Sequence, residues 1–203
     1  MPATDLRFSG RIAGYGTTGG VRIVLGLWST SPFGSFADAM IEDSRGKRLL
    51  LAPTQEIADF IATTYTFDDI EIGTVGWTRL PTGLRFVGGP LDTTLRIGGS
   101  SPLGRALRAV PKPLAVNPLW LQTIDPVARA LQPGARTAGS AGNGRREYYG
   151  VTGARRITAA TASWSGSDLG TLAPLAPPVR FGFGSAPADP HLVDIVTTVR
   201  QPA

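Results

Sequence analysis

The apolar residues of this chain recur in short runs that either alternate with polar residues or are nearly continuous, and both patterns are typical of β-strands. Tight turns separate many of the runs. Asp43–Gly46, for example, ends in a glycine that tolerates the positive φ of a hairpin turn. The pattern predicts about ten strands. The strand-like segments are Leu6–Ala13, Val21–Trp28, Phe36–Glu42, Lys47–Leu51, Asp69–Val75, Leu84–Val87, Thr93–Ile97, Glu147–Val151, Arg156–Ala162, Arg180–Gly184 and Leu192–Val199.

A few segments follow helical rules instead. After Thr54, a suitable N-cap, four apolar residues fall at i, i+3, i+4 and i+8, which is one stripe of an α-helix. They are Ile57, Phe60, Ile61 and Tyr65. Further along, three pairs combine an N-cap side chain with proline at the first helical position. They are Ser101-Pro102, Asn117-Pro118 and Asp125-Pro126.

These elements predict one mainly β domain over residues 1–203. The strands are joined mostly by tight turns, so we expect an antiparallel sheet, and closure into a barrel-like form would remove its exposed edges. About three short helices are inserted, with a helical insertion near 100–133, in which Pro126 bends or breaks a helix. A flexible Gly/Ala/Ser/Arg loop is expected near 133–144. A β-sandwich is the alternative architecture.

The amino-acid composition excludes several kinds of covalent bond, metal site and catalytic group. The chain has no cysteine, which excludes disulfides, zinc–thiolate sites and cysteine nucleophiles, and His191 is its only histidine. We therefore expect no metal site and no cofactor, although the acidic run Asp68-Asp69-Ile70-Glu71 leaves a carboxylate site for Mg²⁺ or Ca²⁺ as an alternative. No apolar run is long enough to span a membrane, and no secretory signal is visible, so a cytoplasmic protein without a membrane partner is expected.

Charge is distributed unevenly along the chain. Residues 38–72 contain eight acidic and three basic residues, whereas residues 73–156 contain twelve basic and three acidic ones. An arginine-rich half can bind an anion, although two solvated faces of opposite charge would give the same count.

Aromatic residues interleaved with arginines suggest one binding segment. Arginine can contact phosphate while tyrosine stacks on bases or lines a ligand pocket, but strand alternation sends adjacent tyrosines to opposite faces. The segment comprises Arg145, Arg146, Tyr148, Tyr149, Arg155 and Arg156. Trp28 and Trp77 are candidate walls of a cavity inside a small barrel.

Other motifs give weaker indications. Gly14–Gly19 matches G-x-G-x-x-G, but a strand-like segment follows it, so a hairpin loop is favoured over a dinucleotide site. Lys112, between two prolines, is a candidate Schiff-base lysine if it is desolvated, and Asp38 and Glu42 are candidate catalytic carboxylates. Barrel-type acetoacetate decarboxylases use such a lysine, but the acidic neighbours of their lysine motif are absent around Lys112.

Several stretches resemble a group of uncharacterised actinobacterial proteins. The resemblance lies in Ser31–Asp38, Leu50–Thr54, Thr66–Asp68 and Phe181–Ser185. It implies a bacterial cytoplasmic protein. That group has no known activity, so no functional residue is transferred from it.

The sequence leaves three functions open. The first is a β-barrel that binds a small, partly apolar ligand, which can be anionic. The second is an enzyme without a recognised motif, based on a lysine or on carboxylates. The third is nucleic-acid binding through residues 145–156, and a homodimer is compatible with each of the three.

Overall fold

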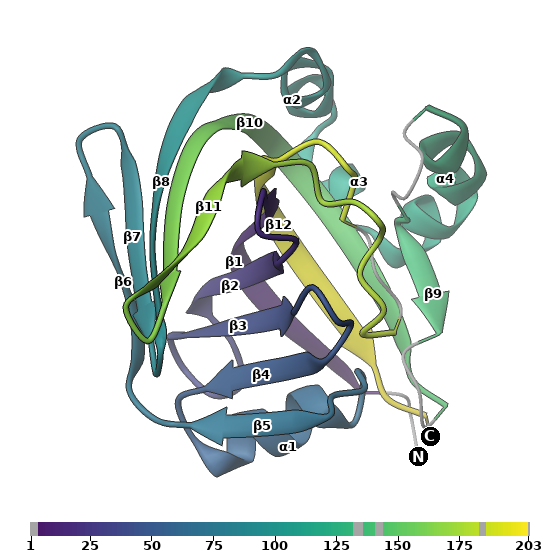
Figure 1. Ribbon diagram of the computed structural model, residues 1–203. Coiled ribbons are helices and arrows are strands. Elements are labelled where there is room, and N and C mark those ends of the chain that lie inside the picture. The colour runs from purple at the N-terminus through teal and green to yellow at the C-terminus, as the bar shows by residue number, and fades with distance from the viewer. Residues whose placement is uncertain (1–3, 132–135, 141–143, 183–185, 203) are drawn as a thin grey trace.

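The computed structural model describes residues 4–131, 136–140, 144–182 and 186–202, and a single large sheet dominates them (Figure 1). The mainly β prediction is confirmed. The strands are β1 (Asp5–Thr17), β2 (Arg22–Thr30), β3 (Phe36–Glu42), β4 (Arg48–Ala52), β5 (Asp69–Ile72), β6 (Val75–Leu80), β7 (Gly83–Gly88), β8 (Leu91–Ser100), β9 (Ala138–Ser140), β10 (Arg146–Trp164), β11 (Ser167–Ala173) and β12 (His191–Arg200). The helices are α1 (Gln55–Ala62), α2 (Pro102–Ala109), α3 (Lys112–Ala115) and α4 (Pro118–Leu131).

The sheet curves into a partial ring. Its strands follow the order β5-β4-β3-β2-β1-β11-β10-β8-β7-β6, and β12 pairs with both β1 and β10. Because β11 also bridges β1 and β10, the long strands are joined twice, which closes the sheet in its middle while its ends stay separate. The pairing is antiparallel with one exception among the described strands. β4 and β5 run parallel, since α1 provides the crossover that a parallel pair requires.

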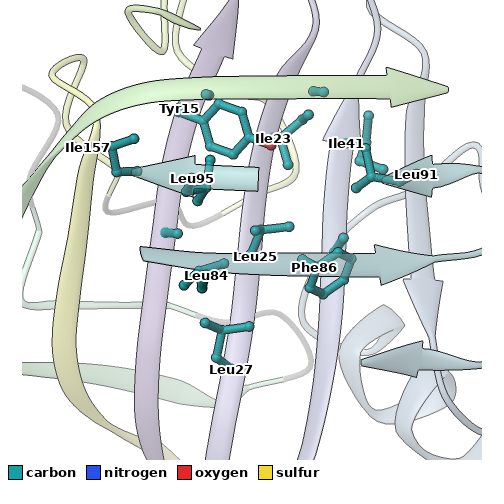
Figure 2. Close-up of a cluster of buried hydrophobic side chains, with 14 of the residues drawn as sticks. Tyr15, Ile23, Leu25, Leu27, Ile41, Leu84, Phe86, Leu91, Leu95 and Ile157 are labelled. Atoms are coloured by element: carbon teal, nitrogen blue, oxygen red, sulfur yellow. The ribbon is translucent and has the colours of Figure 1, made fainter. Parts of the chain in front are cut away.

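One face of β1–β3 packs tightly against β7, β8 and part of β10 (Figure 2). Ile23 and Leu25 are fully buried there, and Leu84 and Phe86 meet them from β7. The buried Tyr15 hydroxyl donates to Thr93 Oγ1 at 2.7 Å, and that hydroxyl in turn donates to the Thr161 carbonyl at 2.9 Å. We call this face the packed face. Its few polar groups are bonded to one another, so it has the properties of a conventional core.

The predicted helix caps are largely confirmed. Thr54 Oγ1 accepts from Ile57 N, Ser101 Oγ from Gly104 N, and Asn117 Oδ1 from Leu119 N. The third predicted start is wrong, because Pro126 lies inside a continuous α4. Asp125 instead accepts hydrogen bonds from the backbone of Thr137 and Ala138, which ties α4 to β9.

Two other local predictions need correction. Part of the loop expected near 133–144 is strand β9, and residues 133–135 and 141–143 of it lie outside the described residues. The strand expected at Arg180–Gly184 is absent over residues 180–182, and its remainder also lies outside the described residues. The glycine motif behaves as expected of a hairpin, since Gly14 and Gly16 belong to β1 and the turn follows at residues 18–20.

Candidate functional site

The opposite face of β1–β3 borders a cavity of about 230 Å³. We call this face the cavity face. Because side chains alternate along a strand, every second residue of β2 points into the cavity, namely Val24, Gly26 and Trp28, while Ile23, Leu25 and Leu27 belong to the packed face. Strands β10 and β12 contribute further walls, and most of the surface they present is apolar.

Segments outside the sheet cover the cavity. Phe60 and Tyr65 reach it from α1 and the turn that follows, and Leu107 reaches it from α2. Phe181 and Pro187 lie in the segment between β11 and β12 and add apolar surface. The cavity is therefore lined by parts of the chain that are far apart in sequence, together with the curved sheet.

Asp38 is the first of two acidic residues in this apolar setting. Its side chain is 4% exposed, and its Oδ1 accepts a hydrogen bond from Trp28 Nε1 at 2.9 Å. Burial raises the pKa of Asp38 to about 6, although the bond from Trp28 acts in the opposite direction. No described residue donates to Oδ2, and Asp38 lines the cavity, so Oδ2 is the oxygen that a ligand can reach.

Gly26 provides the space for this pair. It faces Asp38 across the β2–β3 ladder. A Cβ atom at Gly26 would lie 2.3 Å from Asp38 Oδ1 and 2.7 Å from Trp28 Nε1, both far inside contact distance. The bond between Trp28 and Asp38 therefore requires glycine at this position.

Glu147 is the second buried acid, and it forms a cluster with two tyrosines. The hydroxyls of Tyr65 and Tyr149 lie 3.0 and 2.8 Å from Glu147 Oε2, and 2.5 Å from each other. Burial is the main cause that raises the pKa of Glu147, and burial likewise raises the pKa of both tyrosines. Asp38 also acts on Tyr65, since its negative charge contributes to raising the pKa of that phenol. The two acidic centres therefore border one cavity, and the charge of Asp38 acts on the Glu147 cluster through Tyr65.

Arg145 lies next to this cluster. Its guanidinium donates to Thr63 Oγ1 and sits over the ring of Phe60, 5.3 Å from the centroid. Its positive charge lowers the pKa of Glu147, but burial outweighs this effect. Arg145 thus supports the wall of the cavity behind Phe60.

Two hydroxyls at the cavity have no hydrogen-bond partner among the described residues. They are Thr64 Oγ1 and Thr197 Oγ1, and Thr197 is 5% exposed. A buried polar group without a partner costs folding free energy, so such groups mark places where a bound molecule or water would be stabilised.

The two tyrosines of the predicted Arg/Tyr segment point to opposite sides of β10. Tyr149 lines the cavity, whereas Tyr148 points to the other side, where Gln122 Nε2 donates to its hydroxyl at 2.9 Å and Arg200 lies over its ring. Neither ring is exposed, so the two tyrosines offer no stacking surface for nucleic acid.

The predicted arginines are likewise dispersed. Arg146 and Arg156 are exposed, and Arg155 lies 3.8 Å from Asp194. Of the two tryptophans, Trp28 lines the cavity. Trp77 is exposed on β6, where Arg11 lies over its ring at 5.5 Å, and both tryptophans border a second pocket together with Arg11 and Asp194. The predicted residues therefore lie in several places. Trp28 and Tyr149 line the cavity, and Trp28 and Trp77 border the second pocket.

The residues predicted to act in an enzyme also lie apart from one another in the structure. Lys112 is exposed on α3, which corrects the idea of a desolvated lysine. Glu42 is fully buried but is held by Arg22 and Arg180, each 3.0 Å from its Oε1, in an ion cluster that fixes the segment after β11. Asp38 alone of these residues reaches the cavity.

Sequence reasoning missed Tyr65 and Glu147. Tyr65 was expected in the stripe of α1, but the helix ends at Ala62 and Tyr65 follows in a turn. The sequence could have identified Glu147, because it alternates with Tyr149 and Val151 and so lies on the apolar face of a strand. An acid in such a position is rare unless it is paired or functional.

The described residues contain no group of three or more His, Asp or Glu side chains that could hold a metal ion. Their helices include none long and apolar enough to cross a membrane.

Comparison with known proteins yields a distant likeness. No protein-family model and no curated protein matches the chain. Among solved structures, it is similar to the crystal structure of acetoacetate decarboxylase from Legionella pneumophila, with 12% identity, 99% of this chain and 86% of that chain covered, and a TM-score of 0.43. A likeness at this score carries no argument about the site. Similarity to the actinobacterial group stays a prediction.

Proposed function

We propose that this protein binds a small, mainly apolar molecule that carries a hydrogen-bonding oxygen or nitrogen. The observation that carries the proposal is the apolar cavity with two buried acids, Asp38 and Glu147, each held by its own hydrogen bonds. Largely apolar pockets with a few convergent polar groups are the usual form of small-molecule sites. An engineered cavity of roughly 150 Å³ holds benzene, so about 230 Å³ suits a somewhat larger ring system.

The polar side chains of the cavity determine which ligand charge is favoured. Asp38 and Glu147 attract a hydrogen-bond donor and repel an anion whenever they are ionised. Thr64 and Thr197 add hydroxyls without partners among the described residues, which suit either a donor or an acceptor. Arg136 also borders the cavity, but it is exposed, whereas both acids are buried. A neutral ligand with a hydroxyl or carbonyl group therefore fits better than an anionic one, which narrows the range of ligands expected from the arginine-rich half of the sequence.

A calorimetric titration with 2-naphthol tests the proposal. We expect saturable binding with a negative heat-capacity change, which is the signature of apolar burial. The anionic analogue 2-naphthoate should bind at least about tenfold more weakly at neutral pH, a difference of about 1.4 kcal/mol. Absence of saturable binding by both compounds would contradict the proposal, and tighter binding of 2-naphthoate would contradict the argument about charge.

A matched pair of variants locates the binding. Val151→Phe adds a ring at the cavity wall on β10 and should weaken 2-naphthol binding by at least about tenfold. Val87→Phe makes the same change at an exposed position on β7 and should leave the affinity unchanged. Equal effects of the two substitutions would show that the compound binds elsewhere.

A further inference from the structure

We propose that the cavity catalyses proton transfer at a carbon next to a carbonyl group, with Asp38 as the base and the Tyr65–Tyr149–Glu147 cluster as the donor to the carbonyl oxygen. This inference rests on the proposed function, because the substrate is a ligand of the same apolar cavity. It adds a reaction class, the isomerisation of apolar ketones through an enol or enolate.

The position of Asp38 suits a base. One oxygen is held by Trp28 Nε1, which fixes the carboxylate, while Oδ2 receives no hydrogen bond from a described residue and faces the cavity. Apolar walls such as Val24 and Met40 surround it, so little water is available to solvate the carboxylate. A fixed, weakly solvated carboxylate is a stronger base than one in water.

The geometry of the second cluster allows it to donate. Its three oxygens lie within 2.5 to 3.0 Å of one another in the pairs described above. When Glu147 is protonated, each of the three groups carries one proton, and linking them in a chain uses two. The two shorter contacts run from Glu147 to Tyr149 at 2.8 Å and from Tyr149 to Tyr65 at 2.5 Å, so Tyr65 ends the chain and its hydroxyl proton is left for a ligand in the cavity. When Glu147 is ionised, both phenols donate to Oε2 and no donor remains.

The step balances without a co-reactant. Asp38 Oδ2 takes the proton from the carbon next to the carbonyl, and the C–H electron pair becomes the new C=C bond. The carbonyl π pair moves to the oxygen, which is stabilised by the hydrogen bond from Tyr65. Asp38 then returns the proton, either to the same carbon or to a conjugated one, and the second case isomerises a double bond.

Amine catalysis is not supported in this cavity. The chain has two lysines, Lys47 and Lys112, and neither lines the cavity. Lys112 is exposed on α3, and Lys47 pairs with Asp69 outside the cavity. Carbonyl chemistry here therefore depends on carboxylates and phenols.

The test follows deuterium exchange by NMR. 2-Tetralone is incubated in D₂O with the full-length protein, and loss of the proton signals next to its carbonyl is compared with the protein-free rate. We expect clear, saturable acceleration. Asp38→Asn should lower the exchange rate by about 100-fold or more, and Tyr65→Phe by about 100-fold, while 2-naphthol, which resembles the enol of 2-tetralone, still binds to both variants.

Asp59→Asn is the matched control, since Asp59 is exposed on α1 and is not one of the residues that line the cavity. It should retain the full exchange rate. Binding of 2-naphthol without acceleration of exchange would overturn the catalytic inference and leave the proposed function intact. Exchange that survives in Asp38→Asn would exclude Asp38 as the base. Failure of both binding and exchange would overturn both proposals.

Discussion

The two faces of strands β1–β3 are built from the same backbone but differ in the kind of polar group that is buried at each. On the packed face, Tyr15 and Thr93 are deeply buried and bonded to each other. The cavity face carries the buried acid Asp38, and across the same cavity lie the buried acid Glu147 of β10 and Thr197 of β12, whose hydroxyl has no partner among the described residues. Fold stability alone accounts for the first arrangement and disfavours the second. The comparison indicates that the cavity face carries residues that lower stability for the sake of binding.

The largest expected difference between the faces concerns packing. Ile23→Ala removes a fully buried side chain from the packed face and should cost about 4 to 5 kcal/mol of unfolding free energy, near the upper end of such substitutions. Ile195→Ala, on the cavity wall, only enlarges an existing space and should cost about 2 kcal/mol. Urea unfolding of both variants measures this. Equal losses would contradict the distinction between the faces.

Asp38→Asn should change stability with a definite sign. Burial raises the pKa of Asp38 to about 6, so the folded state binds this proton more tightly than the unfolded chain does. Stability then falls as pH rises from about 4 to above 6, by about 3 kcal/mol for one such group. Asn lacks this penalty, so the variant should be about 2 to 3 kcal/mol more stable than the natural protein at neutral pH, and the gain should vanish near pH 4.

Thermal or urea unfolding at the two pH values measures the effect of Asp38→Asn. Asp59→Asn, at an exposed site, should change stability by less than about 0.5 kcal/mol at either pH. A loss of stability in Asp38→Asn at neutral pH would mean that the carboxylate stabilises the folded state, which contradicts the prediction.

Gly26→Ala should disturb the cavity face locally. The added Cβ would collide with Asp38 Oδ1 and Trp28 Nε1, so the carboxylate must leave its hydrogen bond, at a cost of about 1 to 3 kcal/mol. Gly76→Ala is the matched control on β6, because a Cβ there meets nothing within 4 Å. The control should be neutral or slightly stabilising, since alanine restricts the unfolded chain. Weaker 2-naphthol binding in Gly26→Ala only would support the role of the pair.

The smallest expected effects are the changes in stability when the hydroxyl is removed from each of two buried threonines. Thr197→Val removes a hydroxyl that lacks a partner among the described residues and should stabilise the protein by about 1 kcal/mol. Thr93→Val removes two hydrogen bonds on the packed face and should destabilise it by about 1 to 2 kcal/mol. Calorimetric melting of both variants gives the two signs. Destabilisation by Thr197→Val would show that its hydroxyl is satisfied in solution.

The elements that the sequence predicts well are local. Thr54, Ser101 and Asn117 cap helices as expected, because a capping side chain acts on amides within three residues. Of the two outcomes expected at Pro126, a bend or a break, the break and the helix start at Asp125 are wrong, because α4 continues through Pro126 and Asp125 bonds to the distant backbone of Thr137 and Ala138 instead. Competition between a local rule and a distant contact is not visible in one sequence.

The candidate site depends on such distant contacts. Tyr65 and Glu147 are 82 positions apart, and they meet because the turn after α1 packs against β10. Strand alternation does indicate that Asp38 shares a face with Phe36 and Met40, and that Glu147 shares one with Tyr149. The sequence could therefore have identified two acids on apolar faces, but not that the two faces meet in one cavity.

A crystal structure of the protein with 2-naphthol tests the central claim most directly. We expect the rings inside the cavity against Trp28 and Tyr149, with the hydroxyl within hydrogen-bond distance of Asp38 Oδ2 or the Tyr65 hydroxyl. Side chains that fill the cavity, or naphthol bound only on the outer surface, would contradict it.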